Sequence, residues 1–162
     1  IYTIKTLNTV NEKTVESLQT SSATSLVKTL QMIQLQKTIF AVGMFSIFEA
    51  ILQEGLNCTN GFDEAKKILD EEGELDIKLK FDNLILAINV LKHGKGRSYD
   101  ALIANAKSLP FKIKLPNESF FCEGNISEVS TLVQVDDAFV ELCGDIIHEV
   151  TVVIQRVHSE FI

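Results

Sequence analysis

Apolar residues recur at helical spacing along most of this 162-residue chain. The pattern is strongest over residues 25–55, where apolar side chains at intervals of three and four keep one face apolar and spread to nearly every face in the second half. It predicts a long central helix covered on several sides, which ends at Gly55. A mixed stretch rich in Thr and Ser predicts an earlier helix over residues 8–30, and Ser21 and Ser22 either end that helix or cap the next one.

Shorter helical patterns follow the central helix. They predict a charged helix over residues 63–72, an apolar helix over residues 76–92 and a short helix over residues 99–106. Gly73 separates the first two of these, because glycine readily ends a helix.

A last apolar stripe continues to residue 158, and Asp136 or Asp137 is placed to cap it. β-Branched residues dominate its second half, which leaves a strand open there. The length and the spacing of the stripe favour a helix.

Residues 109–117 show a different pattern, in which Phe111, Ile113 and Leu115 alternate with Lys112 and Lys114. The period of two is typical of a half-exposed strand, and a second extended segment at residues 131–135 is placed to pair with it. The sequence therefore predicts one domain over residues 1–162. It is mainly all-α, an antiparallel bundle of four to five helices with a small β-hairpin insertion at residues 109–135 before the last helix.

Composition narrows the classes of function. Hydrophobic residues make up 46% of the chain, enough for a sizeable core, and the net charge is −7. A protein that binds nucleic acid through a general basic surface leans the other way, so any such contact must use a local patch. The longest apolar run falls short of the roughly 20 residues that cross a membrane, so we expect no membrane span.

The number and spacing of the cysteines indicate the kind of cellular compartment in which the protein lies. They are odd in number and widely spaced, which predicts free thiols in a reducing cytoplasm and no zinc knuckle. Two observations leave a secreted protein or a removed leader open: the N-x-Ser/Thr triplets at Asn57, Asn117 and Asn125, and a start at Ile1 rather than Met.

The helix over residues 76–92 ends in candidate chemistry. Asn89 and His93 are four residues apart and share a helix face, and Asp82 lies seven residues before Asn89 on the same stripe. A histidine titrates near neutrality and an amide can orient it or a phosphate, which suits acid–base catalysis. The alternative is that Asn89 is an ordinary surface residue and His93 a helix-end cation stabilised by the helix dipole.

A basic glycine loop follows at once. Lys92, Lys95 and Arg97 surround Gly94 and Gly96, and this combination suits a phosphate, because glycines let backbone amides approach and the cations neutralise charge. The loop lacks the P-loop pattern. A glycine cap with ordinary helix-end cations is the alternative, and it explains the second glycine and Arg97 less well.

Glu49 lies inside the most apolar segment of the central helix, where a carboxylate must find a partner or water. We expect it either to pair with His93 or Arg97 across the bundle and raise the histidine pKa, or to lie on the one exposed stripe of its helix. His148 and His158 are ten residues apart and have no close partner, so we predict no metal site and no cofactor.

The run from Asn89 to Ser98, NVLKHGKGRS, resembles the Asn-x-x-Lys-His-Gly-x-Gly stretch of uncharacterised bacterial proteins of the HEPN superfamily of small helical proteins. Those proteins also carry a preceding aromatic-rich segment that ends in Glu, as residues 45–49 do here. The resemblance implies that His93 is a ribonuclease histidine with Asn89 as its polar companion, and that two copies dimerise with their motif helices facing each other. Ile88 stands where the family has an Arg.

The sequence therefore predicts a HEPN-like homodimer that binds RNA or a nucleotide phosphate, with little or no catalysis, in a defence or toxin–antitoxin system with an antitoxin-like protein partner. Lys92, Lys95 and Arg97 would bind the phosphate, with Glu49 and Asp82 in support. One alternative is a metal-independent endoribonuclease that uses His93 and Asn89. The other is a structural, protein-interaction bundle in which the glycine loop is only a turn.

Overall fold

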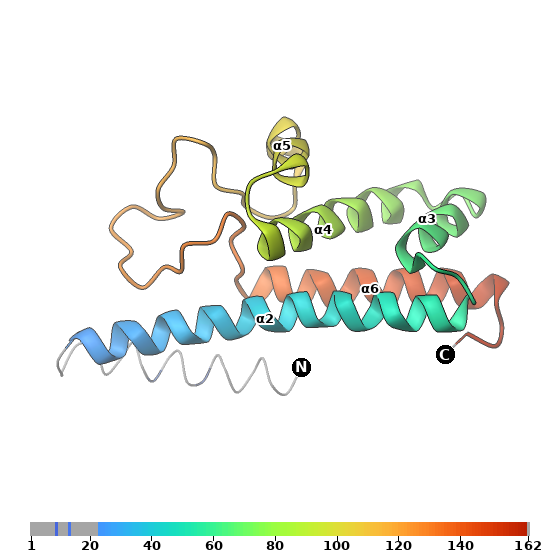
Figure 1. The fold of residues 1–162 in the computed structure, drawn as a ribbon, viewed down its shortest axis with the longest axis horizontal. Helices are drawn as coiled ribbons and strands as arrows, with labels where there is room; N and C mark the ends of the chain where they lie inside the picture. The colour runs from blue at the N-terminus through green and yellow to red at the C-terminus, as the bar shows by residue number, and fades with distance from the viewer. Residues whose placement is uncertain (1–8, 10–12, 14–22, 162) are drawn as a thin grey trace.

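The structure is a computed structural model that describes residues 9, 13 and 23–161. Within these residues it contains five α helices and one short 3-10 helix (Figure 1). They are α2 (Ala23–Gly55), α3 (Gly61–Glu71), α4 (Leu75–His93), α5 (Arg97–Ala104), η1 (Ala106–Ser108) and α6 (Asp137–Val157). The all-α prediction is confirmed, and the β-branched half of α6 is helical. The part of the earlier helix predicted before residue 23 lies outside the described residues, apart from Thr9 and Lys13.

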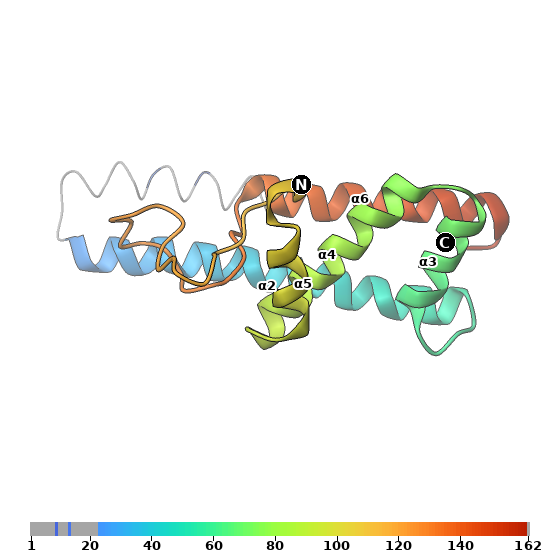
Figure 2. The same ribbon diagram turned by 90° about the horizontal axis from the view of Figure 1, so that it is seen from above.

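Three long helices form the body of the bundle. Helices α2 and α6 lie side by side and run in the same direction, and α4 runs back across both of them (Figures 1 and 2). The short α3 joins the end of α2 to the start of α4 and contacts α2, α4 and α6. Helix α5 follows the end of α4 and lies on the side of α4 that faces away from α2 (Figure 1).

The core is a single cluster of buried apolar side chains from all five α helices and from the segment between α5 and α6. Its aromatic centre joins three helices. The Phe45 and Phe81 rings stack with their centroids 6.1 Å apart, and Phe62 packs edge-on against Phe81 at 5.5 Å. Because α2, α3 and α4 each contribute one of these rings, the cluster fixes the angle at which α3 leaves α2 and α4 returns.

The start of α3 depends on a close approach of two backbones. Asn60 caps the helix, since its side chain accepts a hydrogen bond from the Asp63 amide at 3.2 Å. Gly61 follows, and a Cβ there would lie 2.6 Å from Leu52 Cβ and 2.7 Å from the Glu49 carbonyl oxygen. Only glycine fits this position without a shift of α2 or α3.

The segment between η1 and α6 lies over the N-terminal half of α2 (Figures 1 and 2). The Gln31 side-chain amide donates to the Ile126 carbonyl at 3.1 Å, and the Val129 backbone amide donates to Gln34 Oε1 at 2.9 Å. At the end of the segment, Asp136 caps α6 by accepting a hydrogen bond from the Phe139 amide at 2.9 Å. Of the two candidate caps in the sequence, Asp136 is therefore the one used.

The predicted β-hairpin at residues 109–135 is wrong. No strand occurs in the described part of the chain, and the two segments share one isolated antiparallel bridge, Ile113 with Val133. One backbone group that would extend the pairing is used elsewhere: the Lys114 carbonyl, which lies opposite the Leu132 amide, accepts a hydrogen bond from the Tyr99 hydroxyl at 2.6 Å. This side-chain bond takes the place of a ladder hydrogen bond.

The apolar character of α2 is marked. By length and composition, residues Thr24–Gly55 could cross a membrane, with a mean hydropathy of 1.5 in the most apolar window, of which 33% is buried. Core helices of helical bundles meet the same criteria.

Candidate functional site

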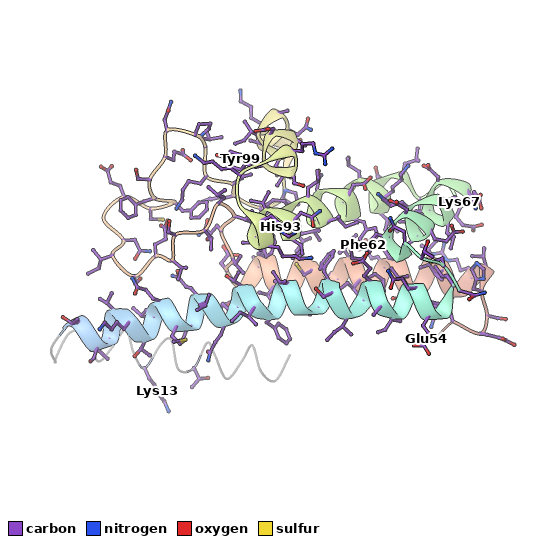
Figure 3. The ribbon with its side chains drawn as sticks, viewed as in Figure 1. Lys13, Glu54, Phe62, Lys67, His93 and Tyr99 are labelled. Carbon is purple, nitrogen blue, oxygen red and sulfur yellow. The ribbon has the colours of Figure 1, made fainter. Side chains whose placement is uncertain are left out.

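The candidate chemistry lies where α4 ends and α5 begins (Figure 3, near His93). Helix α4 stops at Gly94, which has a φ of 74° and donates its amide to the Val90 carbonyl at 2.8 Å. This left-handed conformation favours glycine and turns the chain sharply. Helix α5 then begins at Arg97, so Lys95 and Gly96 form a very short connection between two helix ends.

A first pocket, the inner pocket, lies between α2, α3 and α4 and has a volume of about 210 Å³. It brings together three residues that the sequence singled out, Glu49 from α2 and Asn89 and Lys92 from α4. Ile88, which stands at the position of the HEPN arginine, is buried and lines the same pocket. An apolar side chain therefore occupies the wall that the resemblance assigns to a cation.

Lys66 on α3 also lines the inner pocket, and the sequence analysis missed it. Its Nζ lies 2.9 Å from Asp63 Oδ1 and 3.5 Å from Asp82 Oδ1. Partial burial by itself would lower the pKa of Lys66, but the hydrogen bond to Asp63 and the charge of Asp82 outweigh burial and raise it. Lys66 is therefore a protonated cation that neutralises both carboxylates. It lies on a different helix from Asn89, so helical spacing could not reveal it.

A second pocket, the loop pocket, lies at the junction of α4 and α5 and has a volume of about 280 Å³. Its walls are two side chains from the last turns of α4, the glycine loop and the first residues of α5. They comprise Asn89, His93, Gly94, Lys95, Gly96, Arg97 and Ser98. Asn89 lines both pockets, whereas Lys92 lines only the inner one.

The cations around the loop pocket have no acidic partners. Lys92, Lys95 and Arg97 are exposed, and within residues 23–161 none of the three forms an ion pair. Most other described lysines do, including Lys37 with Asp137 and Lys78 with Asp70. Within residues 23–161, a protein of net charge −7 therefore gathers three cations without ion-pair partners at this helix junction.

The start of α5 adds backbone donors to the loop pocket. The N-cap is Gly96, which has no side chain to cap the helix, and the first helical bond runs from the Asp100 amide to the Gly96 carbonyl at 3.0 Å. The amides of residues 97–99 consequently have no partner within the helix. Together with Lys95 and Arg97, they present a positive surface suited to an anion.

The structure separates some residues that the sequence expected to meet. Glu49 is half-buried in the inner pocket, whereas His93 and Arg97 line the loop pocket, and no ion pair joins Glu49 to either of them in the described chain. Asp82 pairs with Lys66 on α3 and lines neither pocket. His93 is exposed at the end of α4.

The described residues contain no cluster of side chains that could bind a metal ion. No group of three or more His, Cys, Asp or Glu side chains converges there, and His148 and His158 lie far apart on α6 and just beyond it. Comparisons with models of known families, with curated proteins and with solved structures found no match for this chain. The HEPN resemblance thus remains a prediction from the motif at residues 89–98.

Proposed function

We propose that this protein binds the phosphate groups of RNA or of a nucleotide at the loop pocket. The proposal rests on the combination, around one pocket, of Lys95 and Arg97, which form no ion pair within residues 23–161, with the uncapped amides of α5. Charge-assisted hydrogen bonds from Arg and Lys, and free amides at a helix start, are the groups that hold phosphate oxygens in proteins.

The size and openness of the site favour part of a larger ligand. A volume of about 280 Å³ is near the lower limit of the ~300–1,000 Å³ typical of small-molecule pockets. This suits one phosphate with its adjoining sugar, and the exposed rim leaves room for a nucleic-acid strand to continue. Lys92, exposed one turn away from the loop, adds charge along that path.

Binding without turnover is favoured by the surroundings of His93. A general base needs a partner that fixes its ring and its tautomer, and among the described residues His93 has no hydrogen-bonded or charged partner. The HEPN arginine position is occupied by the buried Ile88. A partner that orients His93 and a cation at position 88, the two features that cleavage would need, are therefore both missing among the described residues.

The test is RNA binding by a charge-matched pair of variants. Fluorescence anisotropy with a short single-stranded RNA measures affinity for wild type, for K95A/R97A and for K107A/K112A, whose lysines also lack ion pairs in the described chain but line a different pocket. We expect K95A/R97A to bind about tenfold or more weakly and the control to bind nearly as well as wild type. Equal losses would reject the loop pocket as the site. A parallel titration with a nucleoside triphosphate distinguishes RNA from a free nucleotide.

A metal-independent endoribonuclease is the second candidate, because His93 and Arg97 line the same pocket. In that reaction His93 would remove the proton from the ribose 2′-hydroxyl, whose oxygen then bonds to the adjacent phosphorus. Arg97 would stabilise the phosphorane, and the P–O5′ bond would break as the 5′-oxygen takes up a proton from His93 or from water, which leaves a 2′,3′-cyclic phosphate. RNA cleavage in EDTA by wild type and by H93A decides this. Equal, background-level rates would eliminate the nuclease, and a complete loss in H93A would establish it.

The HEPN resemblance alone supports two remaining proposals, a homodimer and a role in a defence or toxin–antitoxin system with an antitoxin-like partner. The odd number and wide spacing of the cysteines support a third, a cytoplasmic location. Co-purification with the product of the neighbouring gene tests the role in such a system. If wild type binds neither RNA nor nucleotide, the protein-interaction bundle becomes the better reading, which the exposed apolar surface of α2 also favours.

A further inference from the structure

A third pocket, the segment pocket, lies between α2, the start of α6 and the segment that joins α5 to α6. This segment covers the N-terminal half of α2 (Figures 1 and 2). The pocket has a volume of about 240 Å³, whereas one water molecule needs only ~10–15 Å³, so it is large enough for a small molecule. Its polar walls include Gln34, Lys37, Thr38, Asn125, Thr131 and Asp137.

Two side-chain amides in the segment pocket have their oxygens occupied. Gln34 Oε1 accepts a hydrogen bond from the Val129 backbone amide at 2.9 Å. Asn125 Oδ1 accepts from the backbone amide of Ser127 at 3.2 Å and from its hydroxyl at 2.7 Å. Only the oxygen of a side-chain amide can accept from an N–H group, so these bonds fix which end of each amide is free. Neither NH₂ group has a hydrogen-bond partner within residues 23–161, and both remain as donors.

Lys37 supplies further donors from α2. The residue is only 6% exposed, and in the described part of the chain its ammonium group pairs with Asp137 alone. An ammonium group has three N–H donors, so this single ion pair leaves N–H groups without a protein partner. Because an unpaired buried donor is unfavourable, these groups require an acceptor inside the pocket.

Two threonine hydroxyls in the same walls act as acceptors. Thr38 donates its hydroxyl proton to the Gln34 carbonyl at 3.0 Å, and Thr131 donates to the Val133 carbonyl at 2.8 Å. Since each proton is already used, the lone pairs of the two hydroxyl oxygens are left to accept hydrogen bonds. The segment pocket therefore presents fixed donors and fixed acceptors within one cavity.

The charges in the walls favour an uncharged ligand. The Glu128 carboxylate is neutralised by Lys114, and the Asp137 carboxylate is neutralised by Lys37. The remaining carboxylate among the described lining residues, Asp136, caps α6 and leaves a small negative excess. This excess disfavours an anion, and the buried Lys37 ammonium group disfavours a cation.

We propose that the segment pocket binds a neutral sugar. Each hydroxyl of a sugar both donates and accepts hydrogen bonds, so a ring of hydroxyls matches walls that hold donors and acceptors together. The two NH₂ groups and the buried ammonium group donate to sugar oxygens, and the two threonine oxygens accept from sugar hydroxyls. Ile33, Phe121 and Val135 add apolar surface for the C–H groups of the ring.

Sugar binding goes beyond the proposed phosphate binding and does not depend on it. Among the described residues, the segment pocket shares none with the inner pocket or the loop pocket. K95A/R97A is therefore expected to leave sugar affinity unchanged. Substitutions in the segment pocket are likewise expected to leave RNA affinity unchanged, so failure of one proposal is distinguishable from failure of the other.

Calorimetric titration of the full chain tests the class of ligand. We expect D-glucose, D-galactose or D-mannose to bind with a dissociation constant of about 1 mM and to raise the melting temperature. The uronate of the sugar that binds best, which carries an added carboxylate, is expected to bind more weakly. The proposal is overturned if none of the three sugars binds at about 50 mM, since the pocket then holds water only. Tighter binding of the uronate would overturn it in favour of an anion site.

Two isosteric variants test the donors. Q34E and N125D each replace the free NH₂ group by an oxygen and keep the oxygen that accepts from the segment, so the segment stays in place. We expect each variant to bind the sugar about tenfold or more weakly. Q36E and N117D make the same chemical changes at exposed positions outside the pocket and are expected to bind like wild type. Equal affinities in all four variants would reject the pocket as the sugar site.

Deoxy analogues of the bound sugar give a test that requires no variant. Removing a hydroxyl that contacts the walls leaves a buried donor or acceptor unpaired, so at least one analogue is expected to bind about tenfold more weakly. If every analogue binds as well as the parent sugar, the hydroxyl groups are not recognised and the proposal is wrong.

Discussion

Lys114 Nζ lies 2.9 Å from Glu128 Oε1 within the segment that joins α5 to α6, and the two side chains are only 6% and 7% exposed. The carboxylate also accepts the amides of Phe121 at 3.0 Å and Cys122 at 3.3 Å, and the ammonium group lies 4.5 Å from the centre of the Phe121 ring. A segment without strands thus closes around a buried ion pair whose hydrogen-bonding groups are satisfied.

Removing the charge of Glu128 is expected to destabilise the fold. E128Q leaves the Lys114 ammonium buried without its counter-ion, so we expect the free energy of unfolding to fall by about 3 kcal/mol. Urea denaturation measures this. E123Q, an exposed position in the same segment, is the control and is expected to change stability little. Equal stability of E128Q and wild type would contradict the importance of the pair.

The same carboxylate predicts an acid-sensitive stability. Burial alone would raise the pKa of Glu128, but the hydrogen bond from Lys114 and the amides of Phe121 and Cys122 outweigh burial and lower it. A carboxyl group with a lower pKa in the folded state stabilises the fold above its unfolded pKa of about 4.3, and this stabilisation disappears as the pH falls further. We therefore expect the stability difference between wild type and E128Q to narrow below about pH 4, measured by urea denaturation across pH.

Gly61 is expected to tolerate no larger residue. In G61A the new Cβ would lie 2.6 Å from Leu52 Cβ, so α3 must shift from α2 and stability should fall by about 1–3 kcal/mol. G144A is the matched control, because a Cβ there meets open space within α6. It is expected to stabilise the chain by up to about 1 kcal/mol. Thermal or urea unfolding of the two variants compares them directly.

The three cysteines are expected to react at different rates. Cys143 is buried on α6, and burial raises the pKa of its thiol to about 12, whereas Cys122 is exposed. Since the thiolate is the reactive form, a maleimide or disulfide reagent at pH 8 should modify Cys122 first and Cys143 only on unfolding. Mass spectrometry of peptides after timed labelling measures the order. Early labelling of Cys143 would show that α6 opens readily.

Tyr99 connects the start of α5 to the buried segment through its hydrogen bond to Lys114. Y99F is expected to lower stability by about 1 kcal/mol or more, because the buried Lys114 carbonyl loses that donor. Burial first, and then the charges of Asp100 and Glu118, raise the pKa of Tyr99. The stabilisation that follows is complete below the unfolded pKa of about 10 and is lost as the pH rises through the folded value. The ultraviolet absorbance of wild type and Y99F, followed as the pH is raised, shows the ionisation of the Tyr99 hydroxyl as a step above about pH 10 that Y99F lacks.

The helices could be predicted from sequence because each has an apolar stripe that only a helical period explains. The stripe that ends at Val157 is an example, since its β-branched residues did not override its spacing. The hairpin prediction was wrong because it relied on a local pattern. The alternation around Ile113 predicted that Lys114 is exposed to solvent, yet Lys114 is buried like Ile113. Its counter-charge comes from Glu128, fourteen residues later in the chain, which no local pattern reveals.

The candidate site was predictable along one helix and not between helices. Asn89, His93 and the glycine loop share a short stretch of sequence, and the structure places them around one pocket. Lys66 was missed because its contact with Asp82 joins α3 to α4. Glu49 was expected either to pair with His93 or Arg97 or to lie on an exposed stripe. It is half-buried and lines the inner pocket with Asn89.

Asn89 lines both the inner pocket and the loop pocket, so a single substitution at this position changes the lining of both. A mutation that reshapes the anion site for a new ligand will alter the space between α2, α3 and α4 at the same time. Any substitution of Asn89 during evolution therefore changes both pockets together. Any refinement of one alone has to come from residues that only it contains, such as Arg97 or Lys66.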